Sequence, residues 1–357
     1  MKLPFNSAQI FKSLLFTCFF FSSLCCIAQR NEIVVKLVKE GVELHDKGDY
    51  EAAITKFDRA LILDPNDYEA NYEKASSCMY AKRYNESITI SKYLIEKYKD
   101  NPAIKGAYVN LGSAYDDKGN ADSAIIAYNE GLKRFPDFYL LHFNKGLTYA
   151  RQKKWDDAEI CFFGAMKNKP NHAGSLYYTS LLQEKSNKVS AIISGLTFLA
   201  VEPEGKRAKN MYEYIFELFN SFAKKDEKGN STITLSMDDM DNKGKENNFS
   251  MVNMMLGLTA ASAVTDSVKA KTDVEKLSLY IQMMNSSFSV GQDEGKGIYW
   301  KTYVPFFIEM KKKDFVNVFA HIASITSGNE ENIKWINDNQ DKMKTFYEWV
   351  NAYEWKK

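Results

Sequence analysis

Residues 105–136 read KGAYVNLGSAYDDKGNADSAIIAYNEGLKRFP, and this stretch decides the fold. Its pattern of small residues, aromatic residues and a closing proline returns through the front half of the chain. Laid out at fixed offsets, the copies occupy residues 34–67, 68–101, 105–138 and 139–172. A repeat of this length is typical of supersecondary units that stack on one another and bury a continuous core.

Small residues occupy the same places in all four copies. Position eight carries Gly41, Ala75, Gly112 and Gly146, and position 20 carries Ala53, Ser87, Ala124 and Ala158. Two helices can cross closely where such side chains meet, so each copy is predicted to be a helical hairpin. Pro65, Pro136 and Pro170 end the second helix, because proline cannot continue it. Lys82 and Lys99 replace the usual glycine and proline in the second copy, which weakens its turns but keeps the register.

The pattern resembles the tetratricopeptide repeat, a helix–turn–helix unit of about 34 residues. The resemblance implies an all-α fold, with a tetratricopeptide-repeat superhelix (α-solenoid) over residues 34–206. Its last unit, residues 173–206, is degenerate, because Ile192 replaces the small residue at position 20. We expect that unit to cap the array or to form a transition to the rest of the chain. Residues 207–357 show no such resemblance, and their apolar periodicity predicts a mostly helical C-terminal domain.

Three features of the C-terminal domain carry specific expectations. The apolar spacing from Ile333 to Tyr353 predicts one long amphipathic helix. Residues 232–237 alternate polar and apolar side chains, which indicates a short strand or an ordered loop, with disorder as the alternative. The densest aromatic cluster is expected in the core, with a sugar- or peptide-binding platform as the alternative. It consists of Tyr299, Trp300, Tyr303, Phe306 and Phe307.

The resemblance also places positions 2, 5, 9, 12 and 13 of each unit on a concave face. The candidate protein-binding residues of this groove are Val38, Val42, Tyr72, Tyr80, Val109, Phe143, Leu147 and Tyr177. The lysine, asparagine and arginine clamp of chaperone-binding members is absent, since Val38, Val42, Tyr72 and Ser76 stand in its place. An apolar groove favours an apolar or amphipathic segment of a protein or peptide as its partner. The alternative occupant is the chain's own C-terminal domain.

Residues 1–28 have the features of a secretory signal peptide. Lys2 and Lys12 precede an apolar run over residues 13–27, and a small residue, Ala28, closes it. Predicted cleavage after Ala28 leaves Gln29 first, removes both lysines and changes the net charge from +1 to −1. The run of about 15 residues is shorter than the roughly 20 that span a bilayer, so no stable membrane span is expected after cleavage. The protein is therefore expected to be exported to the periplasm or cell envelope, or secreted.

No local motif predicts chemistry. The acidic stretch from Asp239 has Lys243 where a calcium loop needs Asp or Asn, and residues 291–297 lack the spacing of a phosphate-binding loop. The four histidines are scattered. Cys78 and Cys161 are predicted to be buried thiols that do not bridge. No catalytic, cofactor-binding or metal-binding residue is therefore predicted, and no cofactor is expected.

Charge composition bears on the class of partner. The chain has 47 Lys and Arg against 46 Asp and Glu, which gives no electrostatic argument for binding nucleic acid. The function that the sequence favours is a non-enzymatic adaptor or scaffold that binds proteins through the repeat groove. The alternative is an enzyme or glycan-binding module in residues 207–357, with the repeats as a docking arm.

Overall fold

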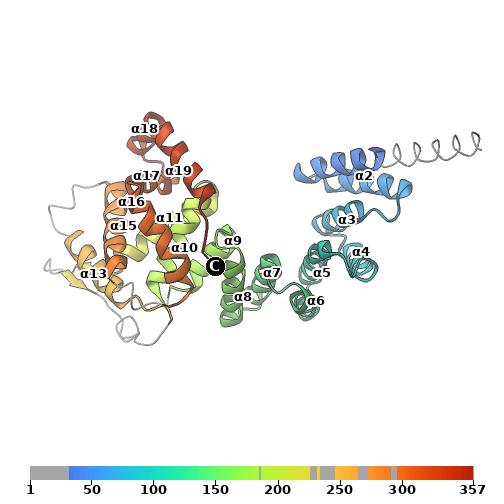
Figure 1. The fold of residues 1–357 in the computed structure, drawn as a ribbon, viewed down its shortest axis with the longest axis horizontal. Helices are drawn as coiled ribbons and strands as arrows, with labels where there is room; N and C mark the ends of the chain where they lie inside the picture. The colour runs from blue at the N-terminus through green and yellow to red at the C-terminus, as the bar shows by residue number, and fades with distance from the viewer. Residues whose placement is uncertain are drawn as a thin grey trace, which may run out of the picture. The chain divides into compact units, whose positions relative to one another are not determined.

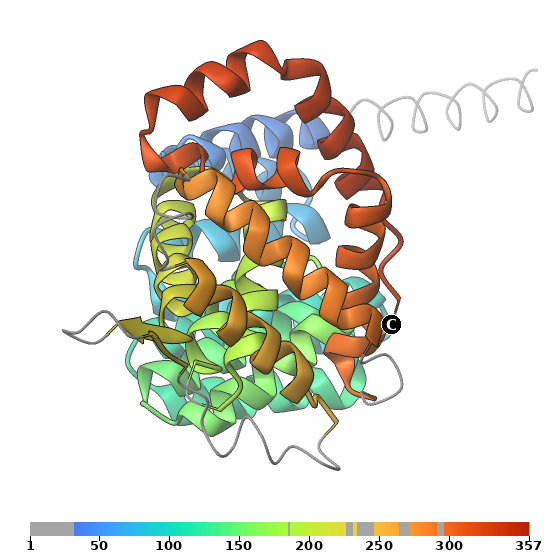
Figure 2. The same cartoon turned by 90° about the vertical axis from the view of Figure 1, so that its left-hand side faces the viewer.

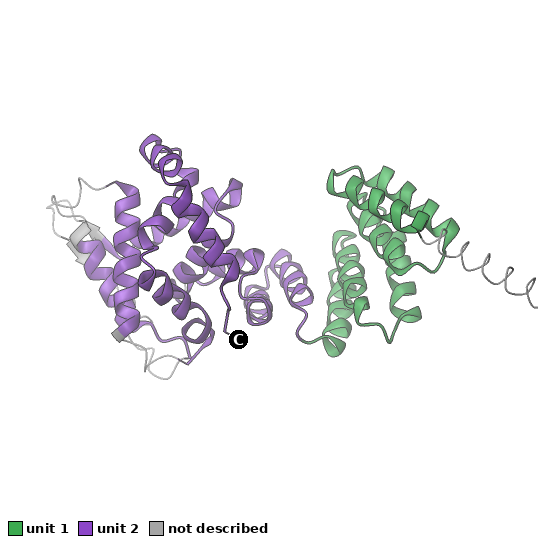
Figure 3. Cartoon of the chain, turned by 45° about the horizontal axis from the view of Figure 1, so that its top comes forward, with its two compact units in different colours: residues 1–136 green, residues 137–357 purple. Residues whose placement is uncertain are grey.

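The computed structural model describes residues 32–184, 186–225, 231–233, 246–263, 272–290 and 296–356. The predicted signal peptide over residues 1–28 lies outside the described residues. The chain divides into two compact units, Met1–Pro136 and Asp137–Lys357, here called the N-terminal and C-terminal units (Figure 3). Each unit is described by itself.

The N-terminal unit consists of antiparallel helical hairpins. A helix over residues 32–46 is followed by α2 (Tyr50–Leu63), α3 (Tyr68–Tyr80), α4 (Tyr84–Lys97), a 3-10 turn (Pro102–Ile104), α5 (Lys105–Asp117) and α6 (Ala121–Arg134) (Figure 1). Each helix from α2 to α6 packs on the next, and α3 also packs on α5. Successive first helices of the repeats are therefore neighbours, as a stacked array requires.

A glycine facing an aromatic ring sets the crossing of the two helices in three of the hairpins. A Cβ added at Gly112 would lie 2.2 Å from Cε1 of Tyr128. The same contact joins Gly41 to Phe57 at 2.4 Å and Gly146 to Phe162 at 2.7 Å. In the second repeat the equivalent positions hold Ala75 and Ser91, and both are fully buried. The repeat thus accepts either glycine with a ring or alanine with a small side chain, which preserves the packed volume.

The turn inside each hairpin requires a left-handed backbone at position 15. Gly48 has φ 81° and Gly119 has φ 90°, conformations that glycine adopts without steric cost. Lys82 has φ 62° and Lys153 has φ 59° at the same position of the second and fourth repeats. The lysine at position 82 therefore keeps the turn of its neighbours, but in a conformation that is unfavourable for a residue with a Cβ.

The C-terminal unit begins with the fourth repeat, α7 (Tyr139–Arg151) and α8 (Trp155–Asn168), and the fifth, α9 (Ala173–Leu182) and α10 (Lys188–Val201). There follow α11 (Gly205–Asn220), β1 (Ala223–Lys225), β2 (Ser231–Ile233), α13 (Ser250–Ala263), α15 (Asp273–Val290), the π-helix η2 (Tyr299–Tyr303), α16 (Val304–Lys312), α17 (Val316–Ala323), the 3-10 turn η3 (Ile325–Ser327), α18 (Glu330–Asp338) and α19 (Gln340–Ala352). Helix α15 lies beside α13, α16 and α17 (Figure 2).

Helix α10 is the centre of the C-terminal unit. All its residues from Val189 to Ala200 are buried, and it packs on α9, α11, α13, α17 and η2. A helix that is apolar on every side belongs inside a protein. The fifth repeat therefore forms the transition between the array and the C-terminal helices, and does not close the array with a polar face. The predicted aromatic cluster is confirmed as core, since Trp300, at 7% exposure, is its most accessible member.

The structure tests two expectations for the C-terminal domain and confirms one of them in part. Part of the alternating segment is a strand: β2 pairs antiparallel with β1, with Ala223 opposite Ile233, while residues 234–237 lie outside the described residues. The prediction of one long final helix is wrong, because the chain breaks at Asn339 between α18 and α19. The Asn339 amide donates to the carbonyl of Trp335 over 2.8 Å and satisfies an end of α18. The apolar spacing continues across the break, so periodicity could not reveal it.

Candidate protein-interaction surfaces

The N-terminal unit contains five of the predicted groove residues. Val38 is 3% exposed and packs with Val34 and Leu37, so its side chain belongs to the core and not to an open surface. Val42, Tyr72 and Val109 are half-buried. Tyr80 is 53% exposed. The helix over residues 32–46 uses a wide apolar stripe for packing, which is why position five is buried in the first repeat.

Tyr72 packs between successive first helices. A Cβ added at Gly106 of α5 would lie 2.7 Å from Cε2 of Tyr72, and the Asn110 amide donates to the Tyr72 carbonyl over 3.4 Å. The C-terminal unit repeats the contact, since a Cβ at Gly174 would lie 2.7 Å from Cζ of Phe143. Sequence reasoning missed these glycines. Both glycines stand at position two of their repeats, the third and the fifth, and this shared position could have indicated the contact.

Three aromatic side chains cluster on the N-terminal unit. The ring of Tyr80 stacks on Tyr50, with centroids 5.2 Å apart, and meets the imidazole of His45 edge-on at 5.2 Å. His45 Nδ1 lies 2.8 Å from Ser77 Oγ, which ties the helix over residues 32–46 to α3. Because Tyr80 remains half-exposed, this cluster presents apolar area to solvent.

Carboxylates border these aromatic residues. Burial raises the pKa of Glu73, and the neighbouring carboxylates Glu69 and Asp46 raise it further. The nearby cation Lys74 is paired elsewhere, with Asp58 of α2 at 2.7 Å and Glu86 of α4 at 3.3 Å. We call the resulting surface the first-helix face. It comprises Val35, Val42, His45, Asp46, Glu69, Tyr72, Glu73, Tyr80 and Val109.

The C-terminal unit contains the other three groove residues, Phe143, Leu147 and Tyr177, and all are half-buried. Phe143 packs edge-on against His172, with ring centroids 4.6 Å apart. Tyr177 contacts Phe198 of α10 at 5.4 Å and lies under the guanidinium of Arg207 of α11 at 5.7 Å. Side chains from the following helices thus cover Tyr177. Whether the two sets of residues share one concave surface stays a prediction.

His172 begins α9 in the C-terminal unit. Its Nδ1 accepts the backbone N–H of Ser175 over 3.3 Å, so the ring acts as the N-cap of the helix. Burial, together with the nearby cations Lys169 and Arg207, lowers the pKa of His172 to about 4. The ring is therefore neutral at physiological pH and accepts this hydrogen bond.

The described residues offer little for chemistry. Within them, no three His, Cys, Asp or Glu side chains gather as a metal site would require. Cys78 and Cys161 are unbridged and buried, as predicted, and burial raises their pKa values to about 12 and about 11. The helices of the described ranges are too short or too polar to cross a membrane. Residues 239–245 and 291–295, which hold most of the two weak motifs, lie outside the described residues.

Comparison with known proteins identifies the class. A tetratricopeptide-repeat family model matches residues 38–102 and 109–173. With the repeated glycine–aromatic crossings, this match shows that the chain is a tetratricopeptide-repeat protein of all-α fold, apart from one short β-hairpin in the described residues. Proteins built on these repeats are in general interaction adaptors.

Individual relatives are distant. A STIP1 homolog from Dictyostelium discoideum is 26% identical over 160 residues, covering 36% of this chain and 28% of that protein. The chain thus spans less than a third of that relative. A TPR protein from Thermus thermophilus is 22% identical, covering 52% of this chain and 98% of that one, at TM-score 0.43. PilF of Pseudomonas aeruginosa is 17% identical, covering 53% and 86%, at TM-score 0.45.

Proposed function

We propose that the protein is an exported, non-enzymatic adaptor that binds an apolar or amphipathic segment through the first-helix face. The observation that carries this proposal is Tyr80, which is 53% exposed although it packs on Tyr50 and His45. Val35 of the same face is 59% exposed. The stacked rings of Tyr80 and Tyr50 form an apolar patch in contact with water, and such patches commonly mark a binding surface.

The acidic residues of the first-helix face indicate the charge that its partner should carry. Burial raises the pKa of Glu73, and the nearby carboxylates Glu69 and Asp46 add to the rise. The ion-pair partners of Lys74 lie on α2 and α4. A lysine or arginine placed among the partner's apolar residues would relieve this repulsion. The preferred partner is therefore an amphipathic helix with cationic residues flanking its apolar stripe.

Defined peptides test this proposal. A Leu/Lys amphipathic peptide of about 18 residues, or five helical turns, is compared with a twin carrying Glu for Lys. Fluorescence polarisation with the full chain is expected to show that the Lys peptide binds more tightly. Glu69→Lys and Tyr80→Ala are expected to weaken that binding, each by about tenfold.

The controls come from the second helix of the third repeat. Glu130→Lys makes the same charge reversal on α6, and Ile126→Ala truncates a side chain there that is 59% exposed. Both are expected to leave the affinity unchanged. Equal affinity for the two peptides, or equal losses from the α6 variants, would contradict the proposal.

Export rests on residues 1–28, whose basic start, short apolar run and final Ala28 have the form of a signal peptide. The proposed location is the periplasm or cell envelope, or the medium. Intact-mass measurement of the protein from its native host is expected to show Gln29 as the first residue. A retained Met1, or a lipid on Cys25 or Cys26, would show that this cleavage does not occur.

A further inference from the structure

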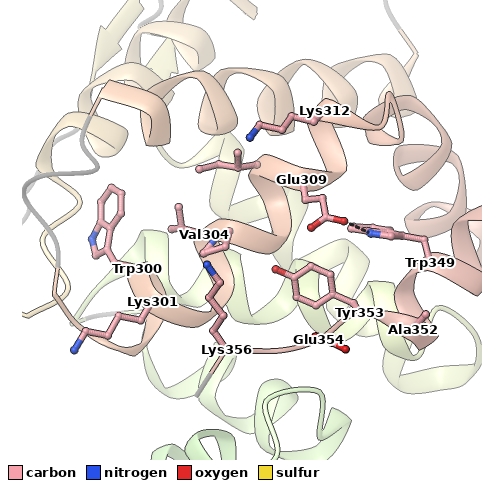
Figure 4. Close-up of a pocket in the computed structure, with 12 residues that line it drawn as sticks. Trp300, Lys301, Val304, Glu309, Lys312, Trp349, Ala352, Tyr353, Glu354 and Lys356 are labelled. Carbon is pink, nitrogen blue, oxygen red and sulfur yellow. Dashed lines mark hydrogen bonds between the residues drawn. The ribbon is translucent and has the colours of Figure 1, made fainter.

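A pocket of about 850 Å³ lies in the C-terminal unit, and none of the repeat residues considered above lines it (Figure 4). Its walls come from η2, from α16 and from the end of α19 with the non-helical residues 353–356. This volume falls within the range of about 300–1,000 Å³ that is usual for sites that bind small molecules.

The first wall is a π-helix held in place by long-range hydrogen bonds. The Trp300 indole donates to the carbonyl of Asn248 over 2.9 Å, and the Tyr303 hydroxyl donates to the carbonyl of Pro170 over 3.0 Å. Single π-helical turns are rare and are found frequently at functional sites. Here the turn carries Trp300 and Lys301 to the pocket.

The third wall is formed by residues 353–356, which follow α19, and Trp355 anchors this segment. The Trp355 ring stacks on Phe306 at 4.8 Å and lies 5.6 Å from Tyr303. This anchor fixes Tyr353 and Lys356, which line the pocket on either side of it. The site is therefore a built hollow with a defined wall at each side, and not a gap left by a free tail.

Three exposed lysines are among the lining residues, one from each wall: Lys301 from η2, Lys312 from α16 and Lys356 from the final segment (Figure 4). Among the described residues, none of the three has an ion-pair partner. Glu309 is engaged, since it accepts the Trp349 indole N–H over 2.8 Å and lies 3.8 Å from Lys313. The lysines therefore leave positive charge that a ligand can neutralise.

The remaining lining suits hydroxyl groups and ring faces. Burial, together with the nearby carboxylate of Glu309, raises the pKa of Tyr353 to about 12, so its hydroxyl stays protonated and can donate. Glu309 and Glu354 line the same pocket and can accept hydrogen bonds from hydroxyls. The half-buried ring of Tyr353 offers an apolar surface on which the apolar face of a ligand ring can stack.

We propose that this pocket binds an acidic oligosaccharide, that is, sugar rings that carry carboxylates. Lysines then pair with the carboxylates, glutamates accept hydrogen bonds from the sugar hydroxyls, and Tyr353 supports a ring. The lining holds three lysines against two glutamates, so a ligand with carboxylates balances its charge better than a neutral sugar does. A compact polyanion such as inorganic phosphate has no ring face for Tyr353 to support and is too small to span walls from three segments. The inference is independent of the first-helix face, because no residue of that face takes part.

The probe is trigalacturonate, with neutral galactotriose and inorganic phosphate as comparisons. Calorimetry on the full chain is expected to show trigalacturonate binding at least about tenfold tighter than either comparison. Lys301→Gln with Lys312→Gln is expected to reduce the affinity by about tenfold or more. Lys344→Gln removes a lysine of α19 that does not line the pocket, and should change nothing. Tyr353→Phe tests the hydroxyl and is expected to cause a smaller loss.

Several results would overturn the assignment. Absence of trigalacturonate binding by the folded full chain would end it. Equal binding of galactotriose would show that the lysines do not select charge, and equal binding of phosphate would remove the sugar from the proposal. Loss of binding in Lys344→Gln to the same degree as in the paired pocket variant would place the site elsewhere. Circular dichroism confirms that each variant remains folded.

Discussion

The two units bury their apolar side chains differently. In the N-terminal unit the described core residues fall into separate clusters, one around Phe57 and another around Leu111. In the C-terminal unit one large cluster extends from Met166 in the fourth repeat to Val350 in α19, while Leu141 and Phe162 of the fourth repeat are buried outside it. A repeat that packs only on its neighbouring repeats leaves one side of its helices in contact with solvent. The C-terminal helices cover Tyr177, whereas the first-helix face keeps Tyr80 half-exposed, and this contrast suggests where a partner binds.

The largest expected loss of stability comes from removing one buried aromatic ring from the core of each unit. Phe57→Ala and Phe219→Ala each remove a fully buried ring and should cost about 3–5 kcal/mol of unfolding free energy. Hydrogen exchange should separate the two. Phe57→Ala is expected to speed exchange only in the helix over residues 32–46, α2 and α3. Phe219 stacks on Tyr280 at 4.4 Å, so its loss should reach α11 and α15 together.

A surface truncation serves as the control for both core variants. Ile62 is 76% exposed on α2, and Ile62→Ala should stay within about 0.5 kcal/mol of the parent. If Phe57→Ala raised exchange across α11 and α15 as well, the two units would share one cooperative core and the comparison would be broken.

Next in size is the close crossing of the hairpin helices. Gly112→Ala places a Cβ against Tyr128, which is 1% exposed and has no room to move, so we expect a loss of about 1–3 kcal/mol. The reciprocal change Ala75→Gly removes a buried methyl group at the same position of the second repeat and should cost about 1–2 kcal/mol, from helix propensity and lost burial. Urea unfolding measures both. A gain in stability from Gly112→Ala, as at an open helical glycine, would contradict the packing account.

Acid should act on the C-terminal unit through His172. In the unfolded chain this ring gains its proton near pH 6.5, whereas its pKa in the fold is about 4. The unfolded state therefore binds more protons between these values, and stability falls as pH drops from about 6.5 to 4. The share of His172 is about 1–2 kcal/mol after allowance for solvent screening of the half-buried ring.

His172→Asn isolates this contribution, because asparagine keeps an N-cap acceptor and does not titrate. The difference in unfolding free energy between parent and variant should shrink below pH 6.5 and level off near pH 4. Parallel pH profiles for the two proteins would show that His172 does not respond to acid in the fold.

The smallest expected effect is a gain in stability from replacing the two lysines that have a left-handed backbone. Lys82→Gly and Lys153→Gly relieve a left-handed backbone at φ 62° and 59°, and each should add about 0.5–1 kcal/mol. Because the turn is the same in both units, the gains should be equal within error. Thermal unfolding monitors them. A loss in either variant would mean that the lysine side chain contributes more than the backbone strain removes.

Much of the repeat region could be predicted from sequence, because its signals are local. The small residues at Gly112 and Ala124 fixed the register, and the helix–turn–helix pattern came with it. The groove residues were harder to predict from the sequence. Val38 and Tyr72 hold the same position in their repeats, yet Val38 is core and Tyr72 is half-buried. Their burial differs because it depends on the neighbouring helix. The lysine-lined pocket combines three segments, and no spacing in the chain links them.

The most direct test of the central claim is hydrogen exchange of the full chain with and without the Leu/Lys amphipathic peptide. The first-helix face predicts that the peptide slows exchange in the helix over residues 32–46, in α3 and in α5. Exchange in α9 and α10 should not change, because their surface is already covered by the chain itself. Slowing confined to α9 and α10, or none in α3 and α5 at saturating peptide, would contradict the account.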